Sequence, residues 1–308
     1  MKALITGING FVGQYLKKEL LMNGYQVTGI DLTVKCDDDL NVDILNYGMV
    51  LKVITEQKPD VIFHLAGQAS VAKSWDIPQL TMELNVIGAL NILEAVRKSN
   101  MKTKIVLVGS SDQYGKISEE KYPINETTEQ LPNTPYAVSK RAQEDIGKIY
   151  ANAYHMNIYM TRSFNHVGVG QAMGFVVPDL AYGIAEIEKG IKEKLIVGNL
   201  ESYRDFADVR DIVRAYRLIS ERGINGSVYN IGSGKCSQIK ELLNILISYA
   251  NKPIKIETNQ SRMRVMDTPV LQCDYGLLQR DTGWKPEIPI ENTLQQMLDY
   301  YRCELEGK

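Results

Sequence analysis

The sequence predicts an α/β protein, a Rossmann-type doubly wound parallel sheet with a smaller mixed α/β lobe toward the C-terminus. The first observation is a series of short runs rich in β-branched and other apolar residues, at 3–5, 26–30, 61–65 and 104–108. Strands of this kind are typical of parallel sheets, because both of their faces are buried. The second observation is that segments with helical spacing separate these runs, at 11–22, 47–56 and 78–99. Such alternation of strand and helix indicates a doubly wound sheet.

The remaining elements continue and then change this pattern. A helix over 135–154 and a strand over 157–162 extend the alternation. Beyond residue 165, helical patterns are interrupted by short strands; the helices are expected at 176–189, 209–221, 237–250 and 290–305, and the strands at 195–198, 228–231 and 254–256. We therefore expect two domains, 1–165 and 166–308. Their boundary is soft, since a late segment is able to rejoin the main sheet.

Composition and charge narrow the class of protein. The 308 residues contain 35 Lys and Arg against 37 Asp and Glu, a net charge of −2, without the basic stripe of a nucleic-acid-binding protein. No apolar run approaches the roughly 20 residues that span a bilayer, and the apolar start breaks at Gly7, too early for a signal peptide. We expect a cytoplasmic protein that binds neither nucleic acid nor membrane. The scattered cysteines predict free thiols and no metal site; they are Cys36, Cys236, Cys273 and Cys303.

A glycine-rich turn follows the first expected strand. Gly7, Gly10 and Gly13 recur at a spacing of three between a strand and a helix. This pattern allows a tight turn, close approach of a pyrophosphate, and amide donors from the helix start, where Phe11 and Val12 lie. The alternative is a sharp turn without a ligand, but the position after strand one favours dinucleotide binding.

An acidic residue ends the second expected strand. Asp31 lies 18 residues after Gly13, where a carboxylate accepts hydrogen bonds from the adenosine ribose and repels a 2′-phosphate. This favours NAD(H), with NADP(H) as the alternative; Asp31 as a simple strand end is the other interpretation. Asp43 and Ile44 are expected beside the adenine.

A tyrosine and a lysine lie four residues apart at the start of the helix over 135–154. Tyr136 and Lys140 therefore share one helical face. Reduction of a carbonyl needs a proton donor, and a neighbouring cation favours the phenolate of a tyrosine, whose pKa is ordinarily about 10. The preceding strand ends in Ser110 and Ser111, and strand ends are where open α/β sheets place their chemistry. A serine there is able to hydrogen-bond the reacting oxygen.

These motifs, in this order, resemble the extended short-chain dehydrogenase/reductases. The resemblance covers nearly the whole chain, through the segments 6–13, 64–67, 85–95, 110–115, 136–140 and 283–286. It implies that Tyr136 is the proton donor or acceptor, that Lys140 also holds the nicotinamide ribose, and that Ser110 orients the substrate. Ser110 is preferred to Ser111 because the family's catalytic Ser or Thr lies four residues before a Tyr-Gly pair. Leu65, Ala66 and Gly67 would contact the cofactor.

The second lobe resembles the branch of that family that handles GDP-mannose and GDP-4-keto-6-deoxymannose. The resemblance makes residues 166–308 a lobe for a nucleotide-diphosphate sugar, with Arg204 and Arg264 as phosphate ligands and Asp267 as the ribose acceptor. Asn165 and Asn199 would supply amide contacts, and His166 is a further candidate for substrate contact. Ser111 and Asp112, beside Ser110, complete the expected substrate residues. Relatives also dimerise through the helices expected at 78–99 and 135–154, so we expect a homodimer.

The expected reaction is reduction of the C4 keto group of a 4-keto-6-deoxyhexose, best matched by the GDP-4-keto-6-deoxy-D-mannose reductases. Dehydratases commonly have Thr where this chain has Ser110 and Glu where it has Asp112, so dehydration is the less favoured interpretation. Val265, Asp267 and Cys273 depart from the branch pattern and keep a dTDP-4-keto-6-deoxyglucose reductase open. Gly67 is a further departure. A sugar 4-epimerase and a redox-silent nucleotide-sugar sensor are the remaining alternatives.

Overall fold

The larger layer of the molecule is a parallel sheet. The computed structural model describes residues 1–33, 35–36, 39–118, 121–259 and 270–307. Seven strands form the sheet, and their neighbours pair in parallel. In spatial order they are β10 (Val228–Ile231), β6 (Ile158–Ser163), β5 (Lys104–Ser110), β4 (Val61–His64), β1 (Lys2–Thr6), β2 (Gln26–Asp31) and β3 (Asp39–Asn41). The doubly wound sheet predicted from the apolar runs is confirmed.

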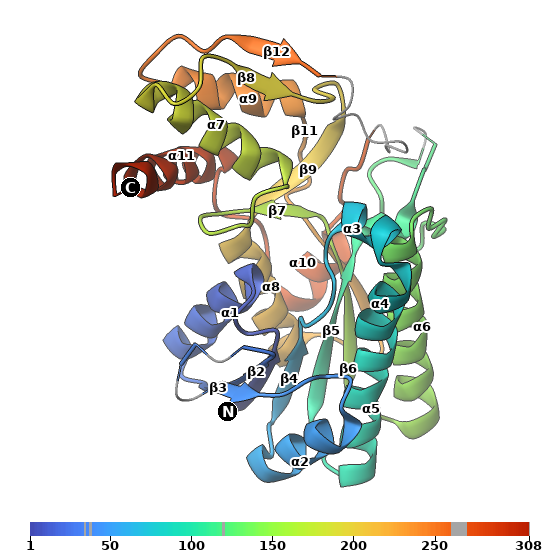
Figure 1. Ribbon diagram of the computed structural model, residues 1–308. Helices are drawn as coiled ribbons and strands as arrows, with labels where there is room; N and C mark the ends of the chain where they lie inside the picture. Colours follow the sequence, from blue (N-terminus) through green and yellow to red (C-terminus); the bar gives the residue numbers. More distant parts are fainter. Residues whose placement is uncertain (34, 37–38, 119–120, 260–269, 308) are drawn as a thin grey trace.

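Helices cover both faces of this sheet (Figure 1). One face carries α1 (Phe11–Met22), α8 (Val209–Arg222) and α10 (Gly276–Thr282); the other carries α2 (Tyr47–Gln57), α5 (Gly88–Ser99) and α6 (Pro135–Tyr154). Strand β4 shows why its residues are apolar throughout. Phe63 packs into the core beneath α1 and α8, whereas Ile62 packs into the core beneath α2 and α5. Successive side chains of a strand point to opposite faces, so both faces require apolar residues.

The segment 78–99, predicted as one helix, is three elements. Helix α3 (Val71–Asp76) precedes it, and α4 (Pro78–Met82) is followed by a π-helical turn at Glu83–Ile87 before α5 begins. The extra residue of the π turn directs Asn85 into the protein, where its amide nitrogen donates to Ser139 Oγ at 2.9 Å. Its amide oxygen accepts from the Gln68 backbone at 2.8 Å. Side-chain bonds therefore compensate for the interrupted helix.

Three long helices enclose the core of the second lobe. They are α7 (Val176–Lys189), α9 (Ile239–Ser248) and α11 (Ile290–Glu306), all predicted to within two residues. The strands β7 (Asn165–Val167), β9 (Tyr203–Asp208) and β11 (Cys236–Gln238) form one sheet, and β8 (Leu195–Val197) pairs with β12 (Ile256–Thr258). The strand expected at 254–256 begins two residues later.

Strand β9 was not predicted because it contains charged residues, yet five of its six residues are buried. Asp205 is fully buried and accepts hydrogen bonds from the backbones of Ser233, Gly234 and Cys273. These donors compensate for the loss of water around the carboxylate. A buried strand of this composition lacks the apolar run by which strands are recognised.

Part of the chain beyond residue 165 returns to the large sheet. Strand β10 pairs with β6 through the register Val228 to Met160, and α8 lies beside α1. Residues 209–231 therefore belong to the larger layer, although they follow the first strands of the second lobe. The sequence analysis allowed a late segment to rejoin the main sheet, and residues 209–231 do so.

All four cysteines are free thiols, of which Cys273 is buried and Cys36 and Cys303 are exposed. Among the described residues, no three His, Cys, Asp or Glu side chains gather in a way that could hold a metal ion. Nor does any helix in the described ranges have the length and apolarity needed to cross a membrane.

Candidate active site

A cavity of about 640 Å³ opens at the carboxyl ends of the central strands. Parallel α/β sheets bind their ligands at this edge. The cavity wall contains sixteen of the residues predicted from the sequence: Gly7, Gly10, Phe11, Val12, Gly13, Asp31, Asp43, Ile44, Leu65, Ala66, Gly67, Ser110, Ser111, Asp112, Tyr136 and Asn165. The expected cofactor residues and the expected catalytic turn thus share one cavity.

The glycine turn leaves no room for side chains. Gly7 has φ +73°, and a Cβ there would lie 2.9 Å from the Ala66 backbone. A Cβ at Gly13 would lie only 2.4 Å from the Gly7 carbonyl oxygen. Gly10 is the N-cap of α1 and has no side chain to cap it. The start of α1 is therefore open to a ligand, and this cradle fits the pyrophosphate of a dinucleotide.

Two charged side chains lie at the far end of the same wall. Asp31 accepts hydrogen bonds from the backbone nitrogens of Asn9 at 3.0 Å and Leu32 at 2.8 Å, which fix its carboxylate at the end of β2. Lys35, which the sequence analysis did not single out, also lines the cavity. The only signal for it was a cation four residues after Asp31.

Tyr136 lies in the first turn of α6, which begins at Pro135 behind the N-cap Thr134. The Ser110 side chain lies beside the Tyr136 phenol, and Ser110 Oγ accepts from the Asp112 backbone at 3.2 Å. Burial raises the pKa of Tyr136 well above its usual value; the Asp112 charge raises it further, while the Ser110 hydrogen bond lowers it. The phenol is therefore protonated at neutral pH.

Lys140 behaves differently from the expectation. Its Nζ donates to the Val108 carbonyl at 2.8 Å and to Gln143 Oε1 at 3.0 Å, and it stays outside the cavity wall. The expected lowering of the Tyr136 pKa by this cation is thus wrong for the structure as it stands, because burial dominates. Burial also lowers the pKa of Lys140 itself, to about 8.

A carboxylate accompanies these groups. Asp112 Oδ2 lies 3.4 Å from Ser110 Oγ, and its charge acts on Tyr136. The 3₁₀ turn at Ser111–Tyr114 holds Asp112 in this place. The site therefore combines a hydroxyl and a carboxylate from the turn after β5 with a protonated phenol from the start of α6.

A second, smaller cavity of about 210 Å³ adjoins the first. Asn165, Val176 and Phe206 line both cavities, so the two are continuous. Asn199 and Arg204 line the smaller one, and Arg204 is almost fully buried with Nη1 donating to the Tyr203 carbonyl at 2.7 Å. Arg264 and Asp267, the other expected substrate residues, lie outside the described residues, as does Val265.

Sequence and structure comparisons agree on the family. The model of the GDP-mannose 4,6 dehydratase family matches residues 4–297. The chain belongs to this family. It is an extended short-chain dehydrogenase/reductase, as the motifs predicted.

Individual members of this dehydratase family differ in the reaction their names state. The chain is 32% identical over 298 residues to the GDP-6-deoxy-D-mannose reductase of Pseudomonas aeruginosa, covering 96% of each. It is 33% identical over 347 residues to a Vibrio cholerae GDP-mannose 4,6-dehydratase, covering 96% of this chain and 92% of the other. Membership confirms the predicted class, an NAD(P)-dependent enzyme of nucleotide-sugar chemistry.

Solved structures of related proteins have the same fold as this chain. The structure of RMD from Pseudomonas aeruginosa complexed with NADPH has a TM-score of 0.89 at 31% identity, covering 98% of this chain and 99% of the other. UDP-glucose 4-epimerase of Thermotoga maritima with UDP-glucose also has a TM-score of 0.89, at 28% identity, covering 99% and 100%. A nicotinamide coenzyme is common to relatives of this family.

His166 joins the glycine turn to the second lobe. Its ring stacks on Phe11, with centroids 6.4 Å apart and planes 7° apart, and its Nδ1 lies 3.0 Å from the Phe164 carbonyl oxygen. Burial lowers the pKa of His166, and the ring lines the large cavity. A neutral ring thus lies between the expected positions of coenzyme and substrate.

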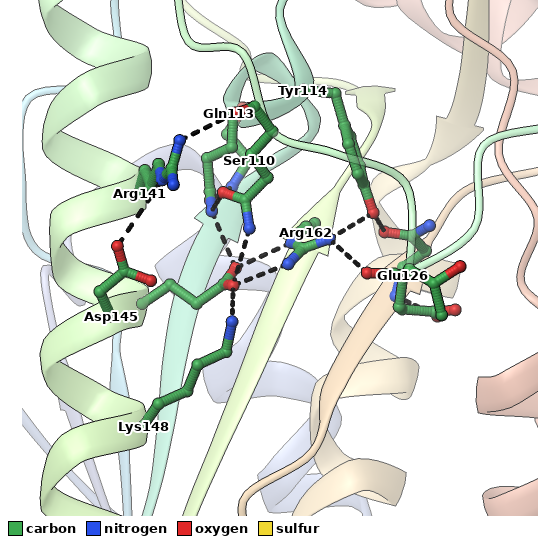
Figure 2. Close-up of polar contacts among 12 residues, drawn as sticks. Ser110, Gln113, Tyr114, Glu126, Arg141, Asp145, Lys148 and Arg162 are labelled. Carbon is green, nitrogen blue, oxygen red and sulfur yellow. Dashed lines mark hydrogen bonds and ion pairs between the residues drawn. The ribbon is translucent and has the colours of Figure 1, made fainter. Parts of the chain in front are cut away.

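Behind the catalytic turn lies a buried polar cluster that the sequence analysis missed (Figure 2). Gln113, Glu144 and Arg162 form its centre, and each is at most 3% exposed. Two signals were present in the sequence. Glu144 continues the four-residue spacing of Tyr136 and Lys140 along one helical face, and Arg162 is a cation within an otherwise uncharged strand.

Proposed function

We propose that this chain reduces the C4 keto group of a nucleotide-activated 4-keto-6-deoxyhexose, with GDP-4-keto-6-deoxy-D-mannose as the preferred substrate. The observation that carries the proposal is the protonated Tyr136 phenol beside the Ser110 hydroxyl, in the same cavity as the glycine turn. The similarity to the Pseudomonas aeruginosa reductase over 96% of both chains supports the choice of sugar and base.

The roles of Tyr136 and Ser110 rest on their place in the cavity wall, and that of Lys140 rests on the family resemblance. A bound nicotinamide coenzyme supplies the hydride. Tyr136 donates a proton to the carbonyl oxygen, and Ser110 hydrogen-bonds the same oxygen and orients it. Lys140 holds the nicotinamide ribose from the next turn of α6.

The second cavity suits the nucleotide part of the substrate. Arg204 is the diphosphate ligand in this proposal, because a buried guanidinium offers forked donors to phosphate. Asn165, shared by both cavities, and Asn199 supply amide contacts. Arg264 and Asp267 remain the proposed second phosphate ligand and ribose acceptor.

We further propose NAD(H) as the preferred coenzyme. The Asp31 carboxylate, fixed by two backbone donors, is placed to bind ribose hydroxyls and to repel a 2′-phosphate. Lys35 in the same wall, and the NADPH named with the Pseudomonas aeruginosa structure, favour NADP(H) as the alternative. The ratio of kcat/KM for NADH and NADPH distinguishes them.

A specific observation favours dehydration as the second candidate. Asp112 carries a carboxylate within 3.4 Å of Ser110, and a GDP-mannose 4,6-dehydratase needs an additional base at C5. A dTDP-linked keto-sugar is the alternative substrate for reduction, and a 4-epimerase uses the same tyrosine. Dehydration, reduction of a dTDP-linked sugar and 4-epimerisation each give a different product from a defined substrate.

The helical layer of α4, α5 and α6 supports a homodimer. It exposes Leu80, Ile87, Val138 and Ile149, which are between 41% and 59% accessible. Pairing this layer with that of a second copy would bury these side chains. Light scattering should give twice the chain mass of 34.7 kDa; a single chain mass would contradict the dimer.

The deciding experiment measures NADH and NADPH oxidation with GDP-4-keto-6-deoxymannose and with dTDP-4-keto-6-deoxyglucose, with GDP-mannose as the dehydratase control. Rapid oxidation with the GDP keto-sugar is the expected result. Coenzyme oxidation with the dTDP sugar alone would show that the substrate carries thymine and not guanine as its nucleotide base. Formation of a keto-sugar from GDP-mannose, without oxidation of either coenzyme, would make the chain a dehydratase.

A further inference from the structure

The two side chains that share the substrate oxygen in the proposed function belong to different elements. Ser110 ends β5, whereas Tyr136 lies in the first turn of α6. The two side chains line the same cavity, and they stay beside each other only if the turn after β5 keeps a fixed position against the helix. The inference that follows rests on the proposed function and concerns what fixes that position.

Gln113 connects the two elements. Its Oε1 accepts from the Ser110 backbone nitrogen at 2.9 Å, and its Nε2 donates to Glu144 Oε2 at 2.8 Å. Glu144 lies on α6, eight residues after Tyr136 and on the same face. Because both ends of the Gln113 amide are bound, its orientation is fixed, and with it the backbone of Ser110.

Glu144 is itself held as a buried anion. Arg162 Nε and Nη2 donate to its two oxygens at 2.8 and 2.7 Å, and Lys148 Nζ donates at 2.5 Å. Burial opposes the charge, but the hydrogen bonds and charge of Arg162 lower the pKa of Glu144 to about 2. A buried carboxylate with this many donors stays ionised and immobile.

The same arginine also holds the other end of the turn. Arg162 Nη1 donates to the Tyr114 hydroxyl at 2.7 Å and to the Glu126 carbonyl at 3.0 Å. The Tyr114 hydroxyl in turn donates to Asn230 Oδ1 at 2.7 Å, on the neighbouring strand β10. The turn at Ser111–Tyr114 is thus anchored at its start through Gln113 and at its end through Tyr114.

We propose that Gln113 is a positioning residue for the reaction, which ties Ser110 to the helix of Tyr136 and Lys140 through the Glu144–Arg162 ion pair. Its hydrogen bonds run to the Ser110 backbone, to Glu144 and, at 3.2 Å, to Gln130 Oε1, so we expect it to act on turnover through Ser110. The loss of Gln113 should therefore affect turnover more than binding.

The test compares Gln113→Leu with wild type under the coenzyme-oxidation assay. The variant keeps the volume but removes the side-chain hydrogen bonds to Ser110, Glu144 and Gln130. We expect kcat to fall roughly 10- to 100-fold, as for a reacting group misplaced by about 1 Å, while KM for the keto-sugar and for NADH changes less than about twofold. A kcat within about twofold of wild type would overturn the proposal.

A matched control and a rescue separate positioning from general stability. Asp145→Asn removes an exposed ion pair with Arg141 on the same helix and should leave kcat unchanged. Gln113→Glu places two carboxylates together and should lower kcat. The double variant Gln113→Glu, Glu144→Gln again pairs one carboxylate with one amide, so it should recover part of the lost kcat. If the losses of kcat in the two single variants simply add in the double variant, Gln113 and Glu144 do not act together and the proposal is contradicted. The isosteric Gln113→Glu also serves as the main variant if Gln113→Leu does not fold.

The proposed function and this inference fail in distinguishable ways. A wild-type enzyme that oxidises no coenzyme with either keto-sugar would reject the reductase, whatever Gln113 does. In that case crystal structures of wild type and Gln113→Leu decide the inference. A Ser110 hydroxyl that lies farther from the Tyr136 phenol in the variant than in wild type supports it, and one that remains in place overturns it.

Discussion

At the residue scale, the Tyr136 phenol carries the proposed proton transfer. Tyr136→Phe removes only the hydroxyl, so kcat should fall roughly 10²- to 10⁴-fold while NADH binding, measured by fluorescence titration, is unchanged. Tyr154→Phe is the matched control, since this tyrosine lies on the same helix and is 49% exposed. Full turnover by Tyr136→Phe would refute the assigned mechanism.

The second residue-scale prediction concerns pH. Burial lowers the pKa of Lys140 from 10.5 to about 8, so this ammonium loses its proton as the pH rises through about 8. In the proposed function, the protonated form is the one that donates to the coenzyme ribose. The kcat/KM for NADH should therefore decline above a pH of about 8 and be full below it.

The pH profiles of wild type and Lys140→Arg test this assignment. Arginine stays charged throughout the range, so whatever activity the variant retains should lack the alkaline decline. A wild-type profile that stays flat through this region would show that Lys140 does not titrate there. Tyr136 does not interfere, because burial keeps its pKa well above this range.

The sequence predicted most of the residues that line the cavity, but not the buried cluster behind them. The glycines, Ser110 and Tyr136 were predictable, because a turn without side chains, a hydroxyl at a strand end and a phenol at a helix start follow local patterns. Gln113 and Arg162 were not, since Glu144, the partner they share, lies 31 and 18 residues away from them. Spacing along the chain reports such contacts only within a helix, where Glu144 gave a signal.

At the element scale, the turn between β1 and α1 depends on its lack of side chains. In Gly13→Ala the new Cβ would lie 2.4 Å from the Gly7 carbonyl and 2.6 Å from that of Ile8, so the turn must shift. We expect the Kd for NADH to rise at least about tenfold, because the helix start moves away from the pyrophosphate.

Gly48→Ala is the matched control for this change. Gly48 lies in the first turn of α2, where the nearest atom to a new Cβ is 3.5 Å away, so alanine fits. It should leave NADH binding unchanged and stabilise the protein by up to about 1 kcal/mol in thermal unfolding. Equal NADH affinity for Gly13→Ala and wild type would show that the turn does not hold the coenzyme.

Regular elements followed from the sequence to the extent that their residues are apolar on a fixed period. Helix α6 was predicted with its bounds, because Thr134 and Pro135 mark its start and its buried face recurs every turn. Strand β9 was not predicted, since its buried Asp205 breaks the apolar pattern and is hydrogen-bonded by distant backbone donors. The π turn around Asn85 was not predicted, because one inserted residue leaves the helical spacing of the sequence nearly unchanged.

At the scale of the whole molecule, the proposed function assigns the coenzyme to the main layer and the nucleotide sugar to the second lobe. Arg204 lines the second-lobe cavity and is 8% exposed. Arg204→Gln should raise KM for the nucleotide sugar roughly 10- to 100-fold, the value of a hydrogen bond to a charged group, without changing the Kd for NADH.

The control for this variant is Arg280→Gln, which removes an equal charge from a side chain that is 69% exposed. Both Michaelis constants and the thermal midpoint should be measured for the two variants. An unchanged KM for the nucleotide sugar in Arg204→Gln, with a normal midpoint, would remove Arg204 from the proposed diphosphate site.

The return of β10 to the large sheet makes the substrate lobe discontinuous along the gene. The lobe is built from β7 to β9, then from β11 to β12, and finally from α11, with α8, β10 and α10 of the main layer between these segments. A fragment ending at residue 165 would leave β6 as an unprotected edge and uncover the side of α1 that α8 shields. Recombination that exchanges substrate preference between relatives must therefore replace several separate segments together, because a single crossover near residue 165 would also exchange α8 and β10 of the main layer.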